Sequence, residues 1–288
     1  MSARRVIRRA LAVVACGMAV GAGMAGIPAN AAGGAVASRA VGSSATHSAL
    51  AGKLSRGILA ALRDRKSSVG LEVDDPGAGL ACELSGSRHF DSASTVKATI
   101  LAALLRKRMQ EHRSLTERER RLAIEMITES DNDAATDLWS DVGRASMQHF
   151  LDLAKMTQTV LGSGSLWGLT QITAGDETRL LRVFTTRNAI LNATARAYEL
   201  RLMASVIPGQ RWGVPAGKPA RVTVHLKNGW LPLPSGGWVI NSIGCFAGPG
   251  RAYSIVVLTD DNPSMAYGIA TIEDVARVVN RELGTVRG

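Results

Sequence analysis

The segment Phe90-Asp-Ser-Ala-Ser-Thr-Val-Lys97 places Ser94 three residues before Lys97. It follows two strand-like runs and continues into a long apolar stretch, so Ser94 is predicted to lie at the start of a helix. Free backbone N–H groups at a helix start point toward an incoming oxygen. Lys97 falls on the same helical face, where its amine can approach the serine hydroxyl. The pair predicts a serine nucleophile with a lysine base, although a serine cap followed by a surface lysine fits the same spacing.

A lysine acts as a base only when its amine is neutral. Partial burial and a nearby positive charge lower a lysine pKa from about 10.4 toward neutrality. The predicted second cation is Lys227, because the motif Lys227-Asn228-Gly229 lies on an alternating strand. Lys227 and Gly229 project to the same side of that strand, and Gly229 lets a ligand approach the backbone. The N–H of Trp230 is predicted to be the second donor to an oxyanion, beside that of Ser94.

A third polar motif, Ser130-Asp131-Asn132, stands between two helical patterns. Ser130 is predicted to relay a proton to a leaving group, and Asn132 to hydrogen-bond an amide substrate. Asp131 is predicted to face inward and hold the loop. Serine, aspartate and asparagine also cap helices, so this motif carries weight only together with the other two.

Helical and strand-like patterns occur in blocks along the chain. A helix at 50–62 and a hairpin at 69–84 come first, a helical region at 94–207 follows, and the chain closes with strands at 220–228, 237–246 and 253–259 and a helix at 263–283. This order predicts an α+β fold, with an antiparallel five-stranded sheet flanked by terminal helices and an all-helical lobe inserted. We predict one domain at 46–288, with an α/β part at 46–92 and 208–288 and a helical lobe at 93–207. The three motifs can meet only at the junction, where small-molecule sites tend to lie.

The first residues have the pattern of an export signal. Four arginines precede an apolar run, and Ala29-Asn30-Ala31 has the pattern of a cleavage site. We predict a signal peptide at 1–31 and a flexible leader at 32–45. The protein is expected to be secreted or cell-wall associated, after export by the Sec or the twin-arginine route. Lipidation at Cys16 is an alternative that the short apolar run before it disfavours.

Composition limits the partners of the predicted mature chain. It has 257 residues and a net charge of +6, because the removed segment holds four arginines and no acid. No dense run of Lys and Arg with interleaved aromatics occurs, so nucleic-acid binding is not expected. No segment of the mature chain is long and apolar enough to span a bilayer. We expect a monomer that acts on a small-molecule or peptidoglycan-derived substrate.

Histidines and cysteines give no sign of a metal site. The five histidines show no ligand spacing with each other or with cysteine, so neither a metal nor a cofactor is expected. His225 shares the strand side of Lys227, but it also fits a core histidine. Cys82 and Cys245 remain after cleavage. The sequence allows either a disulfide between them or two buried free thiols.

In order and spacing, the three motifs resemble those of the class A β-lactamase and penicillin-binding-protein superfamily of serine hydrolases. The similarity also includes Met126-Ile-Thr-Glu-Ser-Asp-Asn132 and the strand residues Asn241-Ser-Ile243. The resemblance implies the fold predicted above and no cofactor. It implies roles for five residues, as nucleophile, acylation base, proton shuttle, substrate amide contact and electrostatic anchor: Ser94, Lys97, Ser130, Asn132 and Lys227.

The chain departs from the superfamily's pattern in three places. The deacylating glutamate of the omega loop, in a Glu-x-x-Leu-Asn pattern, has no counterpart in Leu166-Trp-Gly-Leu-Thr-Gln171, and Asp176 and Glu177 fit the first turn of the next helix. The 36 residues from Ser94 to Ser130 are fewer than in the family, so one cleft wall is expected to be cut back. Asn228 replaces Thr or Ser, and strand 238–246 has no arginine, which leaves only Arg251 as a weak carboxylate anchor.

These features support three functional hypotheses. The first is an exported serine hydrolase that a β-lactam or related amide or ester acylates on Ser94, with weak β-lactam hydrolysis because no base activates water. The second is a D-alanyl-D-alanine peptidase or transpeptidase, which needs no loop glutamate. The third is a non-catalytic module that binds muropeptides or β-lactams.

Overall fold

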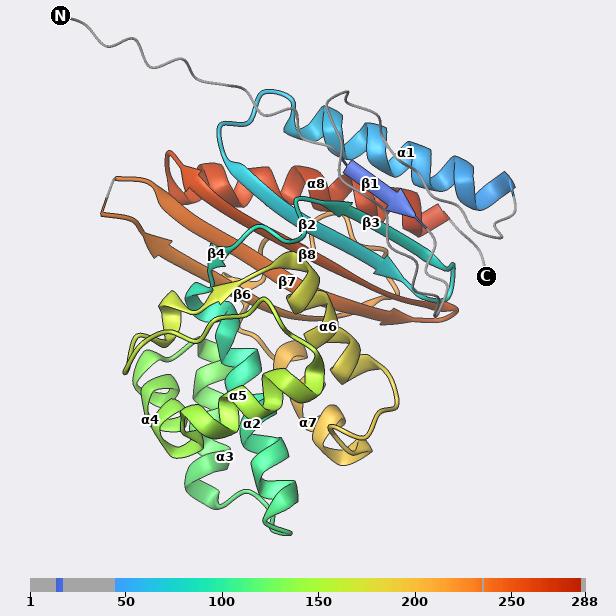
Figure 1. Ribbon diagram of the computed structural model, residues 1–288. Coiled ribbons are helices and arrows are strands. Elements are labelled where there is room, and N and C mark those ends of the chain that lie inside the picture. Colours follow the sequence, from blue (N-terminus) through green and yellow to red (C-terminus); the bar gives the residue numbers. More distant parts are fainter. Residues whose placement is uncertain (1–13, 18–44, 235, 286–288) are drawn as a thin grey trace, which may run out of the picture.

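The strands predicted at the two ends of the chain pair in one antiparallel sheet in the computed structural model, which describes residues 14–17, 45–234 and 236–285 (Figure 1). In the order across the sheet, its strands are β1 (Val14–Gly17), β3 (Leu80–Leu84), β2 (Ser68–Asp75), β8 (Arg251–Asn262), β7 (Trp238–Gly248) and β6 (Thr223–Pro232). The five-stranded sheet is confirmed. The short β1 adds a sixth strand at the edge that is opposite β6.

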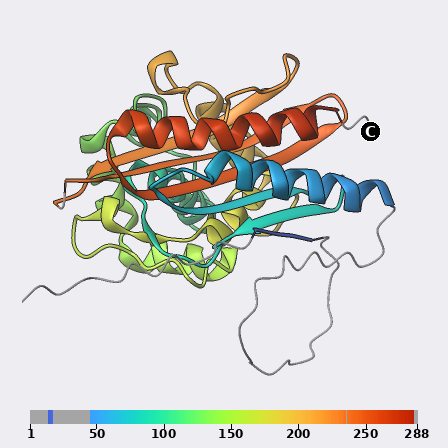
Figure 2. The same cartoon turned by 90° about the horizontal axis from the view of Figure 1, so that it is seen from above.

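Two helices cover one face of this sheet. These are α1 (Ala45–Leu62) and α8 (Met265–Thr285), which lie side by side across the strands (Figure 2). Their apolar sides meet inward-facing residues of β8, including Ile255 and Val257. Residues 239–246 of β7 are all buried, as expected of a strand covered on both faces. The flanking helices predicted at the two ends of the fold are therefore present.

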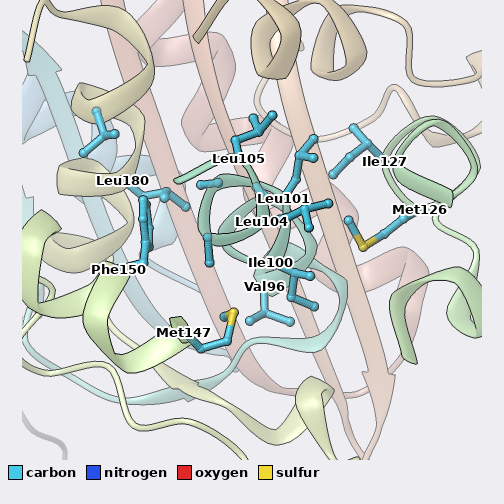
Figure 3. Close-up of a cluster of buried hydrophobic side chains, with 14 of the residues drawn as sticks. Val96, Ile100, Leu101, Leu104, Leu105, Met126, Ile127, Met147, Phe150 and Leu180 are labelled. Carbon is cyan, nitrogen blue, oxygen red and sulfur yellow. The ribbon is translucent and has the colours of Figure 1, made fainter. Parts of the chain in front are cut away.

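The helical lobe covers the other face. Its helices are α2 (Val96–Gln110), α3 (Glu117–Ile124), α4 (Asn132–Val142), α5 (Arg144–Ala154), α6 (Ala174–Thr185) and α7 (Ala193–Ala204), with a π-helical turn at Glu125–Glu129. Every residue of α2 from Val96 to Leu105 is buried, so this helix is the core of the lobe. Figure 3 shows its apolar side chains packed among those of Met126, Met147 and Phe150. Because α2 is held on all sides, its first turn is a rigid base for a site.

Short elements tie the start of α2 to the sheet. The pair β4 (Phe90–Asp91) and β5 (Gln171–Ile172) is antiparallel, and the 3₁₀ turn η1 (Ala93–Thr95) leads directly into α2. Both β6 and β7 contact η1. All three polar motifs therefore approach one point, at the edge of the sheet formed by β6.

Several N-terminal predictions fall outside the described residues. Of the predicted signal peptide, only Val14–Gly17 is described, and of the predicted leader, only residue 45, where α1 begins. Within the part of the chain that is described, no helix is both long and apolar enough to cross a membrane.

The possible disulfide between Cys82 and Cys245 is not formed. Cys245 is a free, buried thiol, whereas Cys82 is disulfide-bonded. Cys82 lies on β3 and Cys245 on β7, with β2 and β8 between them. Three strand spacings separate their backbones by roughly 14 Å, far more than the roughly 4.4–6.8 Å that a disulfide bridges. The backbone register instead places Cys16 of β1 opposite Cys82.

Candidate active site

Ser94 lies in η1, at the entrance to α2, on a backbone that is held from two sides. The backbone N–H of Ser92 donates to the carbonyl oxygen of Thr170 at 2.8 Å. The amide of Asn241 on β7 donates to the carbonyl oxygens of Asp91 at 2.8 Å and Ser92 at 3.2 Å. Between these anchors Ala93 has φ of 46°, a left-handed conformation that costs free energy in a residue with a Cβ. The surrounding contacts hold the strained turn and fix the position of Ser94.

Strand β6 approaches this turn at Gly229. A methyl group on Gly229 would lie 2.8 Å from both the Ser92 carbonyl oxygen and the Ser94 backbone nitrogen, closer than real Cβ contacts come. Only glycine therefore fits here. The next residue, Trp230, lines the same cavity as Ser94. Since β6 is the edge strand, alternate backbone N–H groups have no strand partner on that side, which is compatible with the predicted oxyanion role of Trp230.

Lys97 points from the first turn of α2 toward the Ser130 motif. Its side chain is fully buried, and its Nζ donates to the Ser130 carbonyl oxygen at 2.6 Å, to the Ser130 Oγ at 3.2 Å and to the Asn132 Oδ1 at 2.8 Å. Ser130 has φ of 60°, which ends the π-helical turn and aims the residue back at α2. The amide nitrogen of Asn132 is not used in this bond and is left to face the cavity.

Lys227 reaches the same hydroxyl from the sheet. Its side chain is also fully buried, and its Nζ donates to the Ser130 Oγ at 3.0 Å and to the Asn228 carbonyl oxygen at 2.9 Å. The Ser130 hydroxyl thus joins two lysines, whose amines lie no more than about 6 Å apart. The sequence placed Lys227 as the second cation of the site, and the structure brings it there.

Burial and mutual repulsion disfavour two charged amines at this distance. Burial lowers the pKa of Lys97 to about 7, and the charge of Asp131 opposes the change. Burial, followed by the charge of Lys97, lowers the pKa of Lys227 well below its ordinary value. A neutral amine is therefore accessible near pH 7, which is the protonation state that a general base needs.

A loop between α5 and α6 forms the opposite side of the site. The Lys97 Nζ lies 4.8 Å from the centroid of the Trp167 ring, and the indole N–H donates to Thr136 Oγ1 at 3.1 Å. Residues 161–171 contain no acid. Sequence reasoning missed Trp167, because the only signal in the loop was the missing glutamate. An aromatic ring of this loop, and no carboxylate of it, therefore lies beside the Lys97 amine.

The two acids after the loop do not replace that carboxylate. Both belong to the first turn of α6, as predicted, and both are fully buried. Asp176 accepts from the Gln158 N–H at 2.9 Å and the Thr159 Oγ1 at 2.8 Å, which fixes the loop. Neither oxygen of Glu177 has a hydrogen-bond partner among the described residues. Burial, reinforced by Asp176, raises the pKa of Glu177 to about 8, and neither acid lines the Ser94 cavity.

Four predicted residues lie apart from the cavity or face away from it. The amide of Asn228 donates to the Gln210 and Trp212 carbonyl oxygens at 2.8 and 2.9 Å, so it holds a surface turn instead of a substrate. His225 makes a 2.7 Å contact between its Nδ1 and the Leu200 carbonyl oxygen, on the lobe side of the sheet, as expected of a core histidine. Asp131 is exposed, not turned inward, because its carboxylate caps α4 at the Ala134 N–H.

Arg251, the fourth of these residues, cannot anchor a carboxylate at this site. It stands opposite Gly248 at the far end of β8, whereas Asn241 beside the site pairs with Leu258. Seven strand residues separate Arg251 from Leu258, or roughly 23 Å. The suggestion that Arg251 substitutes for the missing strand arginine is therefore wrong.

The cavity itself is small and has a mixed lining. It encloses about 160 Å³ and is lined by residues of the Ser94 and Ser130 motifs, of the loop and of the part of β6 that follows Gly229: Ala93, Ser94, Ser130, Asn132, Trp167, Gly168, Trp230 and Leu231. No group of three or more His, Cys, Asp or Glu side chains that could hold a metal occurs among the described residues. A hydroxyl, two buried amines and backbone donors at one cavity can form and protonate an acyl-transfer intermediate without histidine.

Known structures share this fold. A class A β-lactamase from Bacteroides cellulosilyticus is 19% identical, covers 82% of this chain and 98% of its own, and superposes with a TM-score of 0.71. A class A β-lactamase from Mycobacterium abscessus is 21% identical, covers 81% of this chain and 100% of its own, and superposes with a TM-score of 0.69. The protein PBP-A is 20% identical, covers 82% of this chain and 97% of its own, and superposes with a TM-score of 0.72.

Sequence comparison identifies the family. No curated protein matches the sequence. The family model described as the beta-lactamase enzyme family matches residues 119–283, which is more than half of the chain and includes the Ser130 and Lys227 motifs. With the fold and the three motifs assembled at one cavity, the chain belongs to the beta-lactamase enzyme family.

Proposed function

We propose that the protein is an exported serine hydrolase that forms an acyl-enzyme on Ser94 with a β-lactam or a related amide or ester. The observation that carries the proposal is the hydroxyl of Ser130 held between two buried amines, at 3.2 Å from Lys97 and 3.0 Å from Lys227. The cavity that contains Ser130 also contains Ser94. A surface lysine beside a capping serine would show neither the burial nor the shared hydroxyl.

In the proposed acylation, every proton is transferred between groups of the site and the substrate. Neutral Lys97 accepts the proton of the Ser94 hydroxyl as the oxygen attacks the carbonyl carbon. The C–N bond then breaks, and Ser130 donates its proton to the departing nitrogen. Lys97, now an ammonium, returns a proton to Ser130 along the 3.2 Å contact. Lys227 holds the Ser130 hydroxyl in place for this relay through its 3.0 Å contact. The N–H groups of Ser94 and Trp230 receive the oxyanion.

Slow release of the acyl group is part of the proposal. Hydrolysis of an acyl-enzyme needs a base beside the water that attacks it. The loop presents the Trp167 ring to the Lys97 amine and has no acid between residues 161 and 171. The acyl-enzyme is therefore expected to persist, and β-lactam turnover to be weak.

A D-alanyl-D-alanine peptidase or transpeptidase is the second candidate, because the same loop favours it. Such an enzyme transfers the acyl group without a loop glutamate. A point mutant of PBP-A, one of the similar folds, is described as an acyl-enzyme complex with penicillin G. A non-catalytic binding module is the third hypothesis and predicts binding without a covalent bond.

Intact-mass spectrometry over time separates these hypotheses. The parent protein, mixed with each of a panel of β-lactams, should gain the mass of one acyl group and retain it for many minutes. The Ser94→Ala variant should show no such gain in mass. Nitrocefin turnover far above one equivalent would show instead a true β-lactamase. Cleavage of a D-Ala-D-Ala peptide would favour the second candidate. Saturable binding with no mass gain would contradict the enzyme proposal.

Export is proposed from the N-terminal pattern alone. The predicted cleavage after Ala31 would remove β1 and leave β3 as the edge strand of the sheet. Sequencing the N-terminus of protein recovered from the culture medium or cell wall should give a start at Ala32. A mature protein that keeps residues 14–17 would contradict the proposed cleavage.

A further inference from the structure

A second and larger cavity lies in the helical lobe, away from Ser94. It encloses about 740 Å³ and lies between the end of α2, the start of α3 and helix α7. Six of its lining residues carry the argument below: Leu105, Arg108, Met109, Arg120, Tyr198 and Arg201. Arg108 follows Lys97 by three turns of α2, so the cavity lies roughly 16 Å along the helix from the site. Its volume falls in the range of small-molecule pockets.

The charge of this cavity is positive. Four arginines line it, and no acid does. Two of them, Arg108 and Arg113, are already ion-paired with Glu111 and Glu119. The other two, Arg120 and Arg201, have no ion pair within the described part of the chain. Two uncompensated guanidinium groups at one hollow attract an anion.

One of these arginines lies over the ring of Tyr198, which also lines the cavity. The Tyr198 hydroxyl is inaccessible to solvent and has no hydrogen-bond partner among the residues described. The Arg201 guanidinium lies 5.0 Å from the centroid of the Tyr198 ring. Burial raises the pKa of this phenol; the charge of Arg201 opposes the rise, that of Glu199 adds to it, and that of Arg120 opposes it. Because the hydroxyl is inaccessible, a ligand in the cavity meets Tyr198 through its ring.

The remaining lining is apolar. Leu105 and Met109 come from α2 and Leu115 from the segment before α3, and Ala195 and Ala197 come from α7. A bare ion would leave these surfaces in contact with water. A ligand that joins an anionic group to an aliphatic or aromatic body would satisfy both parts of the cavity.

We propose that this cavity binds a small amphiphilic anion, a phosphate or carboxylate group on an apolar body, at a site separate from the Ser94 cavity. The anionic group accepts from Arg120 and Arg201, and the apolar body lies against Leu105 and Met109. The site does not involve the serine chemistry proposed above.

Isothermal titration calorimetry with monomeric n-octyl phosphate tests the proposal. The full chain should bind it at one site, more tightly than inorganic phosphate and than the cation octyltrimethylammonium. The double variant Arg120→Gln/Arg201→Gln should bind at least tenfold more weakly, whereas Tyr198→Phe, which removes only the inaccessible hydroxyl, should bind like the parent protein. Arg121→Gln, a neighbouring exposed arginine of α3 that does not line the cavity, should bind like the parent protein.

The outcomes separate this site from the catalytic one. Ser94→Ala should bind octyl phosphate with the affinity of the parent protein. The binding test therefore remains valid even if the acylation experiment fails. Both arginines are exposed, and thermal unfolding should confirm that the double variant folds. Equal binding of the cationic analogue, no measurable binding of octyl phosphate, or unchanged affinity in the folded double variant would overturn the proposal.

Discussion

The two walls of the Ser94 cavity differ in what their side chains can do. On one wall, Lys97, Ser130 and Lys227 form a buried polar cluster in which both amines have hydrogen-bond partners. The other wall presents the Trp167 ring on a loop that contains no acid. In the proposed function, the first wall moves the protons needed to form an acyl bond, and the second offers no acid to activate water for its hydrolysis. The proposal therefore assigns formation and release of the acyl-enzyme to different walls, and each wall can be tested alone.

Removal of Lys97 should have the largest effect on the polar wall. Lys97→Ala takes away the amine proposed to activate Ser94, and loss of a general base typically lowers a rate by roughly 10²–10⁴-fold. Labelling of Ser94 by a fluorescent penicillin, followed on a gel against time, measures the rate. Lys53→Ala, an exposed lysine on α1, is the matched control. Equal rates in the two variants would show that the cluster does not activate Ser94.

Insertion of a carboxylate into the loop wall should speed release. Trp167→Glu places an acid where the ring now lies 4.8 Å from the Lys97 Nζ, so the acyl-enzyme lifetime should fall by roughly 10–100-fold, within the range for a positioned base. Trp167→Phe, which keeps an aromatic ring, should retain the long lifetime. Intact-mass decay after removal of free β-lactam measures both. If Trp167→Glu is acylated and its lifetime is unchanged, the loop does not limit release.

The contact between β6 and the nucleophile turn should be sensitive to a single methyl group. Gly229→Ala would place a Cβ 2.8 Å from the Ser92 oxygen and Ser94 nitrogen, and such overpacking typically costs about 1–3 kcal/mol of unfolding free energy. It should also slow acylation by shifting the Ser94 N–H. Urea unfolding and penicillin labelling measure the two effects. Gly209→Ala, where nothing lies within 4 Å of an added Cβ, should change neither, and a neutral Gly229→Ala would contradict the close approach.

Behind the loop wall, an effect is expected on stability and not on acylation. Burial raises the pKa of Glu177 to about 8, so the folded state holds a proton that the unfolded state releases above about pH 4.3. The unfolding free energy should therefore fall as pH rises from about 4.5 to 8. In Glu177→Gln this pH dependence should be absent, so the decrease in unfolding free energy between about pH 4.5 and pH 7 should be about 2–4 kcal/mol smaller than in the parent protein. Urea titrations at several pH values measure the unfolding free energy, with the exposed Glu117→Gln as the control. The same dependence of unfolding free energy on pH in both variants would contradict this prediction.

The sequence predicted the polar wall better than the loop wall. Lys97, Ser130 and Lys227 could be placed because each stands in a short motif whose helix or strand periodicity sets the direction of the side chain. Asp131 was misplaced because its carboxylate caps the helix that follows, an alternative open to short polar residues. Asn228 was misplaced because its amide binds the carbonyls of Gln210 and Trp212, a contact between distant segments that its own motif does not reveal. Trp167 was missed because a loop has no periodicity from which to read a direction.

In the sheet, too, some features could be predicted from the sequence and others could not. Five strands were predicted from alternation and turns, and their antiparallel pairing follows from the hairpins and the order of elements. The pairing of β1 with β3 could not be predicted, because residues 14–17 lie inside a run with the composition of an export signal. The distance between Cys82 and Cys245 depends on strand order, which spacing in the sequence does not contain.

The central claim is that a neutral Lys97 activates Ser94, and the pH dependence of the acylation rate tests it most directly. Burial lowers the pKa of Lys97 to about 7, so the fraction of neutral amine rises with pH and approaches one above that value. Stopped-flow labelling with a fluorescent penicillin, with Ser94→Ala as the blank, should show a rate that rises about tenfold per pH unit below about 7 and is constant above it. A rate that is constant from about pH 5.5 to 8.5, or that falls as pH rises, would contradict the account.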